Sequence, residues 1–166
     1  MERIEFISKR PSDTVSIGER IGRCSKLGDV FLLYGELGAG KTQFVKGLAK
    51  GLDVPDWEHV VSPSFTLLNT YGGRCGFCHV DLYRLEDVDV MELGIEEYLD
   101  DAVVAVEWAE KSLWWDNTIK VSIAVIGEEE RRIVLEVDDA GRAKVWRDIR
   151  CDTGENRERR ATSDCI

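Results

Sequence analysis

The chain has 166 residues, a length that suits one domain with its own hydrophobic core. Hydrophobic residues account for 43% of the sequence, which argues against intrinsic disorder, and no apolar run approaches the ~18 residues that a membrane-spanning helix requires. The 22 basic and 32 acidic side chains give a formal net charge of −10, which argues against a protein that binds nucleic acid by itself, because such binding requires a basic face.

The N-terminal segment is expected to form an edge strand followed by a helix. Ile4 and Phe6 alternate with polar residues, as in a strand with one buried face. Ser12 or Asp13 can cap the helix, which would end at Gly28. The apolar residues at helical spacing are Ile17, Ile21, Cys24 and Leu27. This segment lacks the apolar core of a signal peptide, so we expect a cytoplasmic protein.

The strongest chemical signal is "GELGAGKT" at residues 35–42, which matches the phosphate-binding pattern G-x-x-x-x-G-K-[ST] in full. Apolar residues 30–34 before it predict a buried strand, and the helical spacing of apolar residues after it predicts a helix. In such a loop, backbone N–H groups hold phosphate oxygens, Lys41 reaches the β and γ phosphates, and Thr42 offers its hydroxyl to magnesium. The loop residues are Gly35, Glu36, Leu37, Gly38, Ala39, Gly40, Lys41 and Thr42. The alternative is a glycine-rich turn that contains a lysine by chance.

Hydrolysis requires a carboxylate beside the magnesium ion, and two residues are candidates. Residues 102–106 predict a buried strand with Glu107 at its C-terminal end. Ligands of open α/β sheets gather at the carboxyl ends of the strands, so Glu107 would lie beside the loop if the two strands are neighbours. It would then contact the ion directly or through water. Asp81 ends the stretch "GFCHVD" and is expected to orient or deprotonate the attacking water. The simpler interpretation of both is a solvated carboxylate at a strand end.

The segment that leads to Asp81 and the one between Asp81 and Glu107 have weaker patterns. Residues 64–84 predict a β-hairpin with Gly72 and Gly73 at its turn. Short helical pieces are expected around residues 91–93 and over residues 95–99.

The C-terminal third predicts an antiparallel strand pair and then an irregular extension. Residues 119–125 and 133–137 alternate in hydrophobicity on either side of a turn at Gly127. Beyond that pair the apolar period is lost apart from three residues, Val145, Trp146 and Ile149. We therefore expect a domain over residues 1–139 and a C-terminal extension over residues 140–166 with a partly mobile tail.

The cysteines allow two metal interpretations that the rest of the sequence does not support. Cys75, Cys78 and His79 spell a haem-attachment signature, and the two cysteines alone could be half of a zinc site. Haem attachment would require export, and zinc would require two further ligands at ordinary spacing. We expect no haem, and we expect thiols at the five cysteines, Cys24, Cys75, Cys78, Cys151 and Cys165.

Four stretches in order resemble the bacterial TsaE family, formerly called YjeE, the small P-loop ATPases of tRNA threonylcarbamoyladenosine synthesis. They are "GELGAGKT", "SPSFTLLNTY", "HVDLYRL" and "EW" after an apolar strand, and the resemblance covers about residues 4–137. It implies a three-layer α/β P-loop domain with a mixed parallel and antiparallel sheet. It also implies ATP and Mg²⁺ as cofactors and hydrolysis that is slow without partners. The implied partners are homologues of TsaB and TsaD, with tRNA contacted only indirectly through that complex.

The resemblance implies roles for individual residues as well. Lys41, Asp81 and Glu107 would be catalytic, with Asp81 near the γ phosphate, and Thr42 and Glu107 would hold the magnesium ion. Residues 62–66 would form a first switch. The second switch would contain His79, Asp81, Tyr83 and Arg84. Further nucleotide contacts would come from Thr14, Trp108 and Arg131, the last easily confused with Arg132.

Three positions depart from the family pattern, and two other function classes stay open. Glu36 stands for the usual Asp, Gln43 for the usual second Thr, and Ser64 for the usual Thr, although Ser64 keeps a hydroxyl. A small-molecule P-loop kinase would need an Arg-rich lid, for which "GEEERR" at residues 127–132 is the one candidate. A docking module that binds nucleotide but hardly hydrolyses it would explain why the sequence contains no evident arginine finger.

Overall fold

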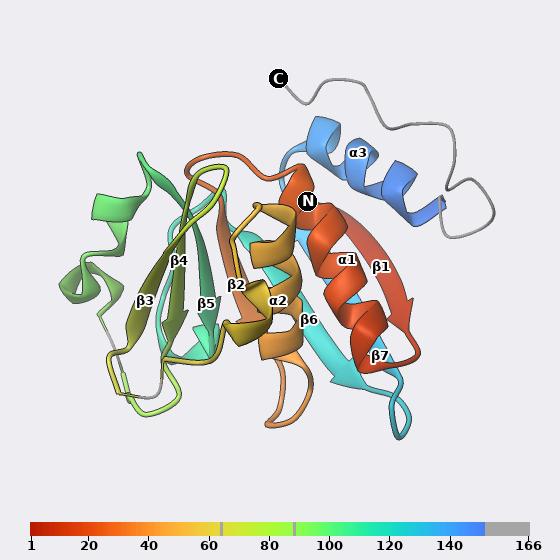
Figure 1. Ribbon diagram of the computed structural model, residues 1–166, viewed down its shortest axis with the longest axis horizontal. Coiled ribbons are helices and arrows are strands. Elements are labelled where there is room, and N and C mark those ends of the chain that lie inside the picture. The colour runs from red at the N-terminus through yellow and green to blue at the C-terminus, as the bar shows by residue number, and fades with distance from the viewer. Residues whose placement is uncertain (64, 88, 152–166) are drawn as a thin grey trace.

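The computed structural model describes residues 1–63, 65–87 and 89–151. These residues form one seven-stranded sheet with the order β1-β7-β6-β2-β5-β4-β3 (Figure 1). Strand β2 pairs in parallel with β5 and β6, and β4 pairs in parallel with β5, whereas β1–β7, β6–β7 and β3–β4 are antiparallel. The strands are β1 (Glu2–Ser8), β2 (Val30–Tyr34), β3 (Leu68–Gly72), β4 (Gly76–Asp81), β5 (Ala102–Glu107), β6 (Ile119–Val125) and β7 (Arg131–Val137). The prediction of an α/β fold with a mixed sheet is confirmed.

Two hydrophobic clusters, one on each face, make the sheet the middle of three layers. The first core cluster lies under the helices α1 (Pro11–Arg23), α2 (Lys41–Gly51) and α3 (Ala140–Cys151), with η1 (Trp57–His59) beside α2. The second core cluster lies under the short 3-10 helices η2 (Val90–Leu93), η3 (Ile95–Tyr98) and η4 (Ala109–Lys111). In β2, Phe31 and Leu33 join the first cluster and Val30 and Leu32 the second, which explains the continuous apolar run in the sequence.

The predicted strands and turns between residues 64 and 137 are present. Strands β3 and β4 form the expected hairpin, with Gly72 paired to Gly76 at its closed end. The expected helical pieces are η2 and η3, and the alternating segments form the antiparallel pair β6–β7. Ser64, Cys165 and the extension over residues 152–166 lie outside the described residues.

The predicted boundaries of the first helix are wrong at both ends. The N-cap is Arg10, and Pro11 occupies the first helical position, where its fixed φ fits the helix and its missing N–H is not needed. Neither Ser12 nor Asp13 is the cap. The helix ends at Arg23 instead of reaching Gly28. The backbone oxygen of Gly22 in its last turn accepts the N–H of Ser25 at 3.1 Å and the guanidinium of Arg74 at 3.0 Å. The chain then turns to enter β2.

The structure adds an element that the sequence pattern did not predict. Residues 140–151 form α3, and its Trp146 is 0% exposed and lies with its ring centroid 6.4 Å from that of Phe31. The helix begins after Asp139, whose carboxylate accepts the N–H of Arg142 at 3.0 Å. That hydrogen bond lowers the pKa of Asp139. The apolar stripe of α3 is narrow, which is why periodicity alone did not reveal it.

The two cysteines of the haem-like signature lie on opposite faces of the sheet. Cys75 packs against the first core cluster, and Cys78 belongs to the second. Burial raises the pKa of the Cys78 thiol to about 12, which opposes the thiolate that a zinc site requires.

Within the described part of the chain, no helix combines the length and the apolarity needed to cross a membrane.

Helices α1 and α2 approach so closely that glycines are required at their crossing. A Cβ atom on Gly47 of α2 would lie 2.2 Å from the backbone oxygen of Val15 and 2.8 Å from the Cα of Gly18 in α1. No side chain fits in this space. The contact fixes α2, and therefore the loop that precedes it, against α1.

We expect Gly47→Ala to destabilise the protein by about 1–3 kcal/mol, because the added methyl group must push two backbones apart. Urea unfolding followed by circular dichroism measures this change. Gly72→Ala is the control, since a Cβ atom on Gly72 meets nothing within 4 Å. Equal stability of the two variants would contradict the packing argument.

Candidate functional site

The loop between β2 and α2 turns through two glycines in the left-handed region of backbone conformation. Gly38 and Gly40 have positive φ values of 80° and 105°, which favour glycine. Gly40 is the N-cap of α2 and has no side chain that could bond to the first N–H groups of the helix, and the first turn contains no acidic residue. The N-terminus of α2 therefore presents backbone donors and a positive dipole end to the neighbouring space.

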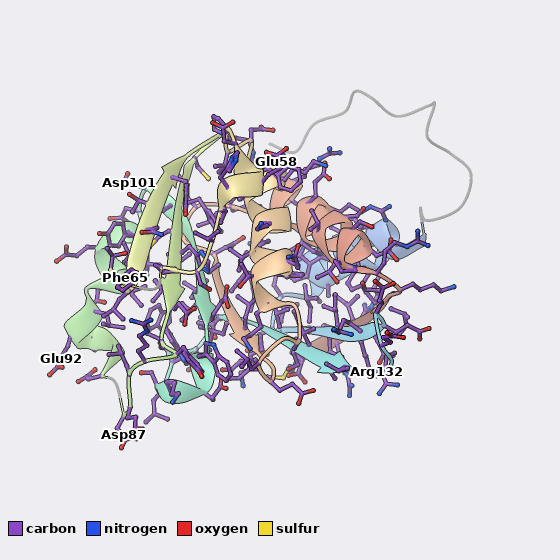
Figure 2. All side chains as sticks on the ribbon, turned by 60° about the horizontal axis from the view of Figure 1, so that its bottom comes forward. Glu58, Phe65, Asp87, Glu92, Asp101 and Arg132 are labelled. Atoms are coloured by element: carbon purple, nitrogen blue, oxygen red, sulfur yellow. The ribbon has the colours of Figure 1, made fainter. Side chains whose placement is uncertain are left out.

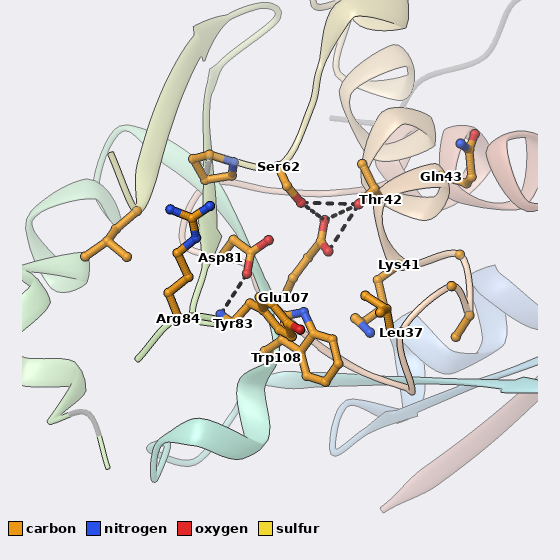
Figure 3. A pocket seen from close by; sticks show the side chains of 15 residues that line it. Leu37, Lys41, Thr42, Gln43, Ser62, Asp81, Tyr83, Arg84, Glu107 and Trp108 are labelled. Atoms are coloured by element: carbon orange, nitrogen blue, oxygen red, sulfur yellow. Dashed lines mark hydrogen bonds between the residues drawn. The ribbon is translucent and has the colours of Figure 1, made fainter. Parts of the chain in front are cut away.

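A cavity of about 520 Å³ lies in front of this loop, at the carboxyl ends of β2, β4 and β5 (Figure 3). Most of the predicted site residues line it. The lining residues are Leu37, Gly38, Ala39, Gly40, Lys41, Thr42, Gln43, Ser62, Pro63, Leu67, Asp81, Tyr83, Arg84, Glu107 and Trp108. Gly35, Glu36, Thr14 and Arg131 are predicted site residues outside this set. Pro63 belongs to the predicted first switch, whereas Leu67 is a lining residue outside the predicted loop and switches.

Lys41 is folded back onto its own loop. Lys41 is only 5% exposed. Its Nζ donates to the backbone oxygen of Gly35 and, at 3.1 Å, to that of Glu36. The same Nζ lies 3.8 Å from the ring centroid of Trp108. Burial lowers the pKa of the Lys41 amine, and nearby carboxylates, Glu107 first, oppose that effect. The cation is thus held at the edge of the cavity by two backbone carbonyls and the Trp108 ring.

Thr42 and Glu107 meet in the middle of the cavity. Strands β2 and β5 are neighbours, with Leu33 paired to Glu107, so Glu107 lies beside the loop as predicted. The Thr42 hydroxyl donates to Glu107 Oε1 at 2.9 Å and lies 3.2 Å from Oε2, and Ser62 Oγ lies 3.4 Å from both Thr42 Oγ1 and Glu107 Oε1. A hydroxyl and a carboxylate supply the oxygen donors that Mg²⁺ prefers. These two residues therefore fit a magnesium ion in their chemistry.

Asp81 lies across the cavity from the loop (Figure 3). It is paired with Glu107 in the parallel ladder β4–β5, so both carboxylates stand at the same edge of the sheet. Its Oδ1 accepts the backbone N–H of Tyr83 at 2.8 Å, which orients the carboxylate. The Tyr83 ring in turn packs 4.9 Å from that of Trp108.

Arg131 holds the loop from outside the cavity. Its Nε donates to the backbone oxygen of Ala39 at 3.0 Å and its Nη2 to that of Gly38 at 3.4 Å, while Nη1 donates to carbonyls of the β6–β7 turn. Arg132 points elsewhere and pairs with Glu5 at 3.4 Å (Figure 2). The geometry favours a role for Arg131 in shaping the loop, and its contact with a nucleotide stays a prediction.

Thr14 also lies behind the loop. It is buried, and its hydroxyl is 2.8 Å from that of Ser8. Its methyl group faces Gly40, since a Cβ atom built there would lie 4.0 Å from Thr14 Cγ2. The hydroxyl is thus engaged within the protein, and nucleotide contact by Thr14 also stays a prediction.

Comparison with known proteins agrees with this geometry. A family model described as "Threonylcarbamoyl adenosine biosynthesis protein TsaE" matches residues 8–133. The chain belongs to the TsaE family. A TsaE protein of Nostoc sp. is 40% identical over 76% of this chain and 80% of its own length, and one of Aquifex aeolicus is 39% identical over 78% and 92%. Both are called "tRNA threonylcarbamoyladenosine biosynthesis protein TsaE".

A solved structure also resembles the TsaE-family fold described here. The crystal structure of Bacillus subtilis YdiB superposes with a TM-score of 0.69 and 28% sequence identity, and the match covers 89% of this chain and 94% of that one. The family match contains the loop, both carboxylates and Arg131, and it ends before α3. The cavity thus lies within the part of the chain that is shared with TsaE proteins, and α3 lies beyond it.

We expect Arg131→Gln to weaken ATP binding by about 5- to 30-fold. The variant loses hydrogen bonds that order the loop at Gly38 and Ala39, which should reduce the free energy of binding by about 1–2 kcal/mol. Isothermal titration calorimetry measures the change. Arg132→Gln, one residue along the same strand, is the matched control and should bind ATP as the unchanged protein does. Similar weakening in both variants would argue for a general charge effect instead of loop support.

Proposed function

We propose that this protein is a magnesium-dependent ATPase that acts in tRNA threonylcarbamoyladenosine biosynthesis together with homologues of TsaB and TsaD. The observation that carries the proposal is the convergence of four groups on one cavity: the glycine loop with Lys41, the Thr42 hydroxyl, and the carboxylates of Glu107 and Asp81. Family membership supports the pathway, since the curated TsaE relatives carry that pathway in their names.

The loop and Lys41 would bind the triphosphate. Phosphate oxygens would accept the backbone N–H groups at the start of α2, where Gly40 leaves them uncapped. The Lys41 amine would exchange its contacts with the carbonyls of Gly35 and Glu36 for contacts with phosphate. The negative charge of ATP favours the protonated amine, which burial alone disfavours. These contacts would set the position of the γ phosphate.

Two carboxylates would then divide the remaining work. Thr42 and Glu107 would hold a magnesium ion, which when bound neutralises phosphate charge. Asp81 stands on the opposite wall, oriented by the N–H of Tyr83, and would position the attacking water or accept its proton. The roles differ because Glu107 is 3% exposed and contacts Thr42, whereas Asp81 is half-buried at the mouth.

The charge of the surface supports an indirect contact with tRNA. The net charge is −10, and the exposed carboxylates of Asp87, Glu92 and Asp101 project outward (Figure 2). A polyanion would be repelled from such a surface. A protein partner that holds the tRNA is therefore the expected intermediary, which fits the proposed action on a transferase complex.

One observation favours a second function, a nucleotide-dependent docking module that hydrolyses ATP negligibly. Among the residues that line the cavity, Lys41 and Arg84 are the cations, and the Arg84 guanidinium lies 5.3 Å from the ring centroid of Phe65. Neither residue supplies an arginine finger as placed, and unassisted P-loop hydrolysis can be very slow. The kinase alternative has less support, because the segment over residues 127–132 is tied to the loop through Arg131.

The test is ATP turnover by the protein alone and with purified TsaB and TsaD homologues. We expect stimulation by the partners and a loss of about 100-fold or more in turnover for Lys41→Ala, which also weakens ATP binding. Lys46→Ala on the same helix is the matched control, since the Lys46 amine bonds to the backbone of Glu58 outside the cavity. Normal turnover in Lys41→Ala would remove the phosphate-loop assignment. ATP-strengthened docking without turnover would favour the second function.

The pathway role has a separate test. Reconstituted modification of tRNA from purified components should stop after few turnovers when this protein is omitted, and it should recover on its addition. Glu107→Ala should not restore it, because the magnesium-dependent step would be lost. Multiple-turnover modification without the protein would overturn the assigned role.

A further inference from the structure

A buried histidine contacts the candidate magnesium ligand from beneath. His79 in β4 is 0% exposed, and its Nε2 lies 2.9 Å from Glu107 Oε1. Strand β4 places Phe77 in the first core cluster, so the alternation of side chains puts His79 and Asp81 on the same face, toward α2. Glu107 therefore meets Thr42 on the cavity side and His79 on the core side.

The direction of this hydrogen bond follows from the chemistry of the pair. An ionised carboxylate can only accept, so the imidazole donates from Nε2. Its other nitrogen, Nδ1, is buried and has no hydrogen-bond partner among the described residues. Glu107 is thus the polar partner of the ring. A buried nitrogen without a partner costs stability, which an apolar side chain at position 79 would avoid, so packing alone does not account for a histidine here.

The contacts of Glu107 are divided unequally between its two oxygens. Oε1 accepts from His79 at 2.9 Å and from Thr42 at 2.9 Å, and it has Ser62 Oγ at 3.4 Å. Oε2 has one contact among the described residues, with Thr42 at 3.2 Å. A carboxylate oxygen has two lone pairs, so Oε1 is occupied and Oε2 keeps the capacity to accept a further partner.

We propose that His79 is a positioning residue for the cation site: its Nε2–H fixes Oε1 of Glu107 and so directs Oε2 toward a divalent cation or the water bound to it. The inference rests on the proposed function, because it requires a cation at Thr42 and Glu107. Hydrogen-bond donors behind a metal ligand typically change metal affinity by about 10- to 100-fold. Loss of the donor should therefore weaken magnesium binding and leave the phosphate contacts of the loop intact.

The test uses two variants of nearly equal size. His79→Gln places an amide N–H about where Nε2 stands, and His79→Met has the same length without a donor. ATP binding is measured by calorimetry at increasing Mg²⁺ concentrations, which gives an apparent dissociation constant for magnesium. We expect this constant to rise about 10- to 100-fold in His79→Met and to return close to its original value in His79→Gln. ATP binding in the presence of EDTA should be equal in all three proteins. The inference would be overturned if His79→Met leaves the magnesium dissociation constant unchanged. It would also be overturned if this variant loses ATP binding in EDTA to the same extent as it loses magnesium-dependent binding.

A measurement on the unchanged protein keeps the inference testable if a variant does not fold. The sequence has two histidines, and His59 is exposed, so ¹⁵N labelling of histidine yields one buried and one exposed ring. We expect the buried ring of His79 to carry its proton on Nε2 and to exchange it slowly with water. A proton on Nδ1 instead would mean that His79 does not donate to Glu107, and the inference would fail.

The two proposals fail in different ways. If the unchanged protein binds ATP without any dependence on magnesium, the proposed function and the positioning role both fail. If magnesium dependence is present and His79→Met leaves it unaltered, the positioning role alone fails.

Discussion

Parallel pairing of β5 with β2 on one side and β4 on the other is the constraint on which the cavity depends. The register pairs Leu33 with Glu107 and Asp81 with Glu107, so the ends of three strands coincide. Each strand supplies one component there: β2 leads into the glycine loop, β5 ends in the carboxylate that meets Thr42, and β4 ends in the carboxylate opposite. A shift of one residue in either ladder would turn Glu107 or Asp81 to the other face of the sheet.

Two charged side chains of the cavity, Lys41 and Glu107, are almost entirely buried. Lys41 is surrounded by backbone carbonyls and an indole ring, and Glu107 is surrounded by two hydroxyls and an imidazole. Such burial strengthens electrostatic contacts and makes every unpaired group costly. Both side chains are therefore held in place without a ligand, because each already has polar partners within the protein.

The sequence predicted what depends on neighbouring residues and missed what depends on distant ones. The loop, its flanking strand and helix, and Glu107 at a strand end follow from local patterns, although the adjacency of β2 and β5 had to be assumed. The contacts of Arg131 with Ala39 and of Arg74 with Gly22 join residues 92 and 52 positions apart, and no local pattern encodes them. The bond between His79 and Glu107 is of the same kind, because it requires the register of β4 against β5.

Helix α3 lies beyond the region matched by the TsaE family, yet its tryptophan completes the core above β2. Trp146 covers Phe31, and the backbone of Ile149 accepts a hydrogen bond from Arg20 of α1 at 3.2 Å. A fragment trimmed to the family boundaries would leave an aromatic-sized hole over the very strand that carries the glycine loop. The functional unit of this chain therefore extends to at least residue 151, and expression boundaries chosen from homology alone would cut through its hydrophobic core.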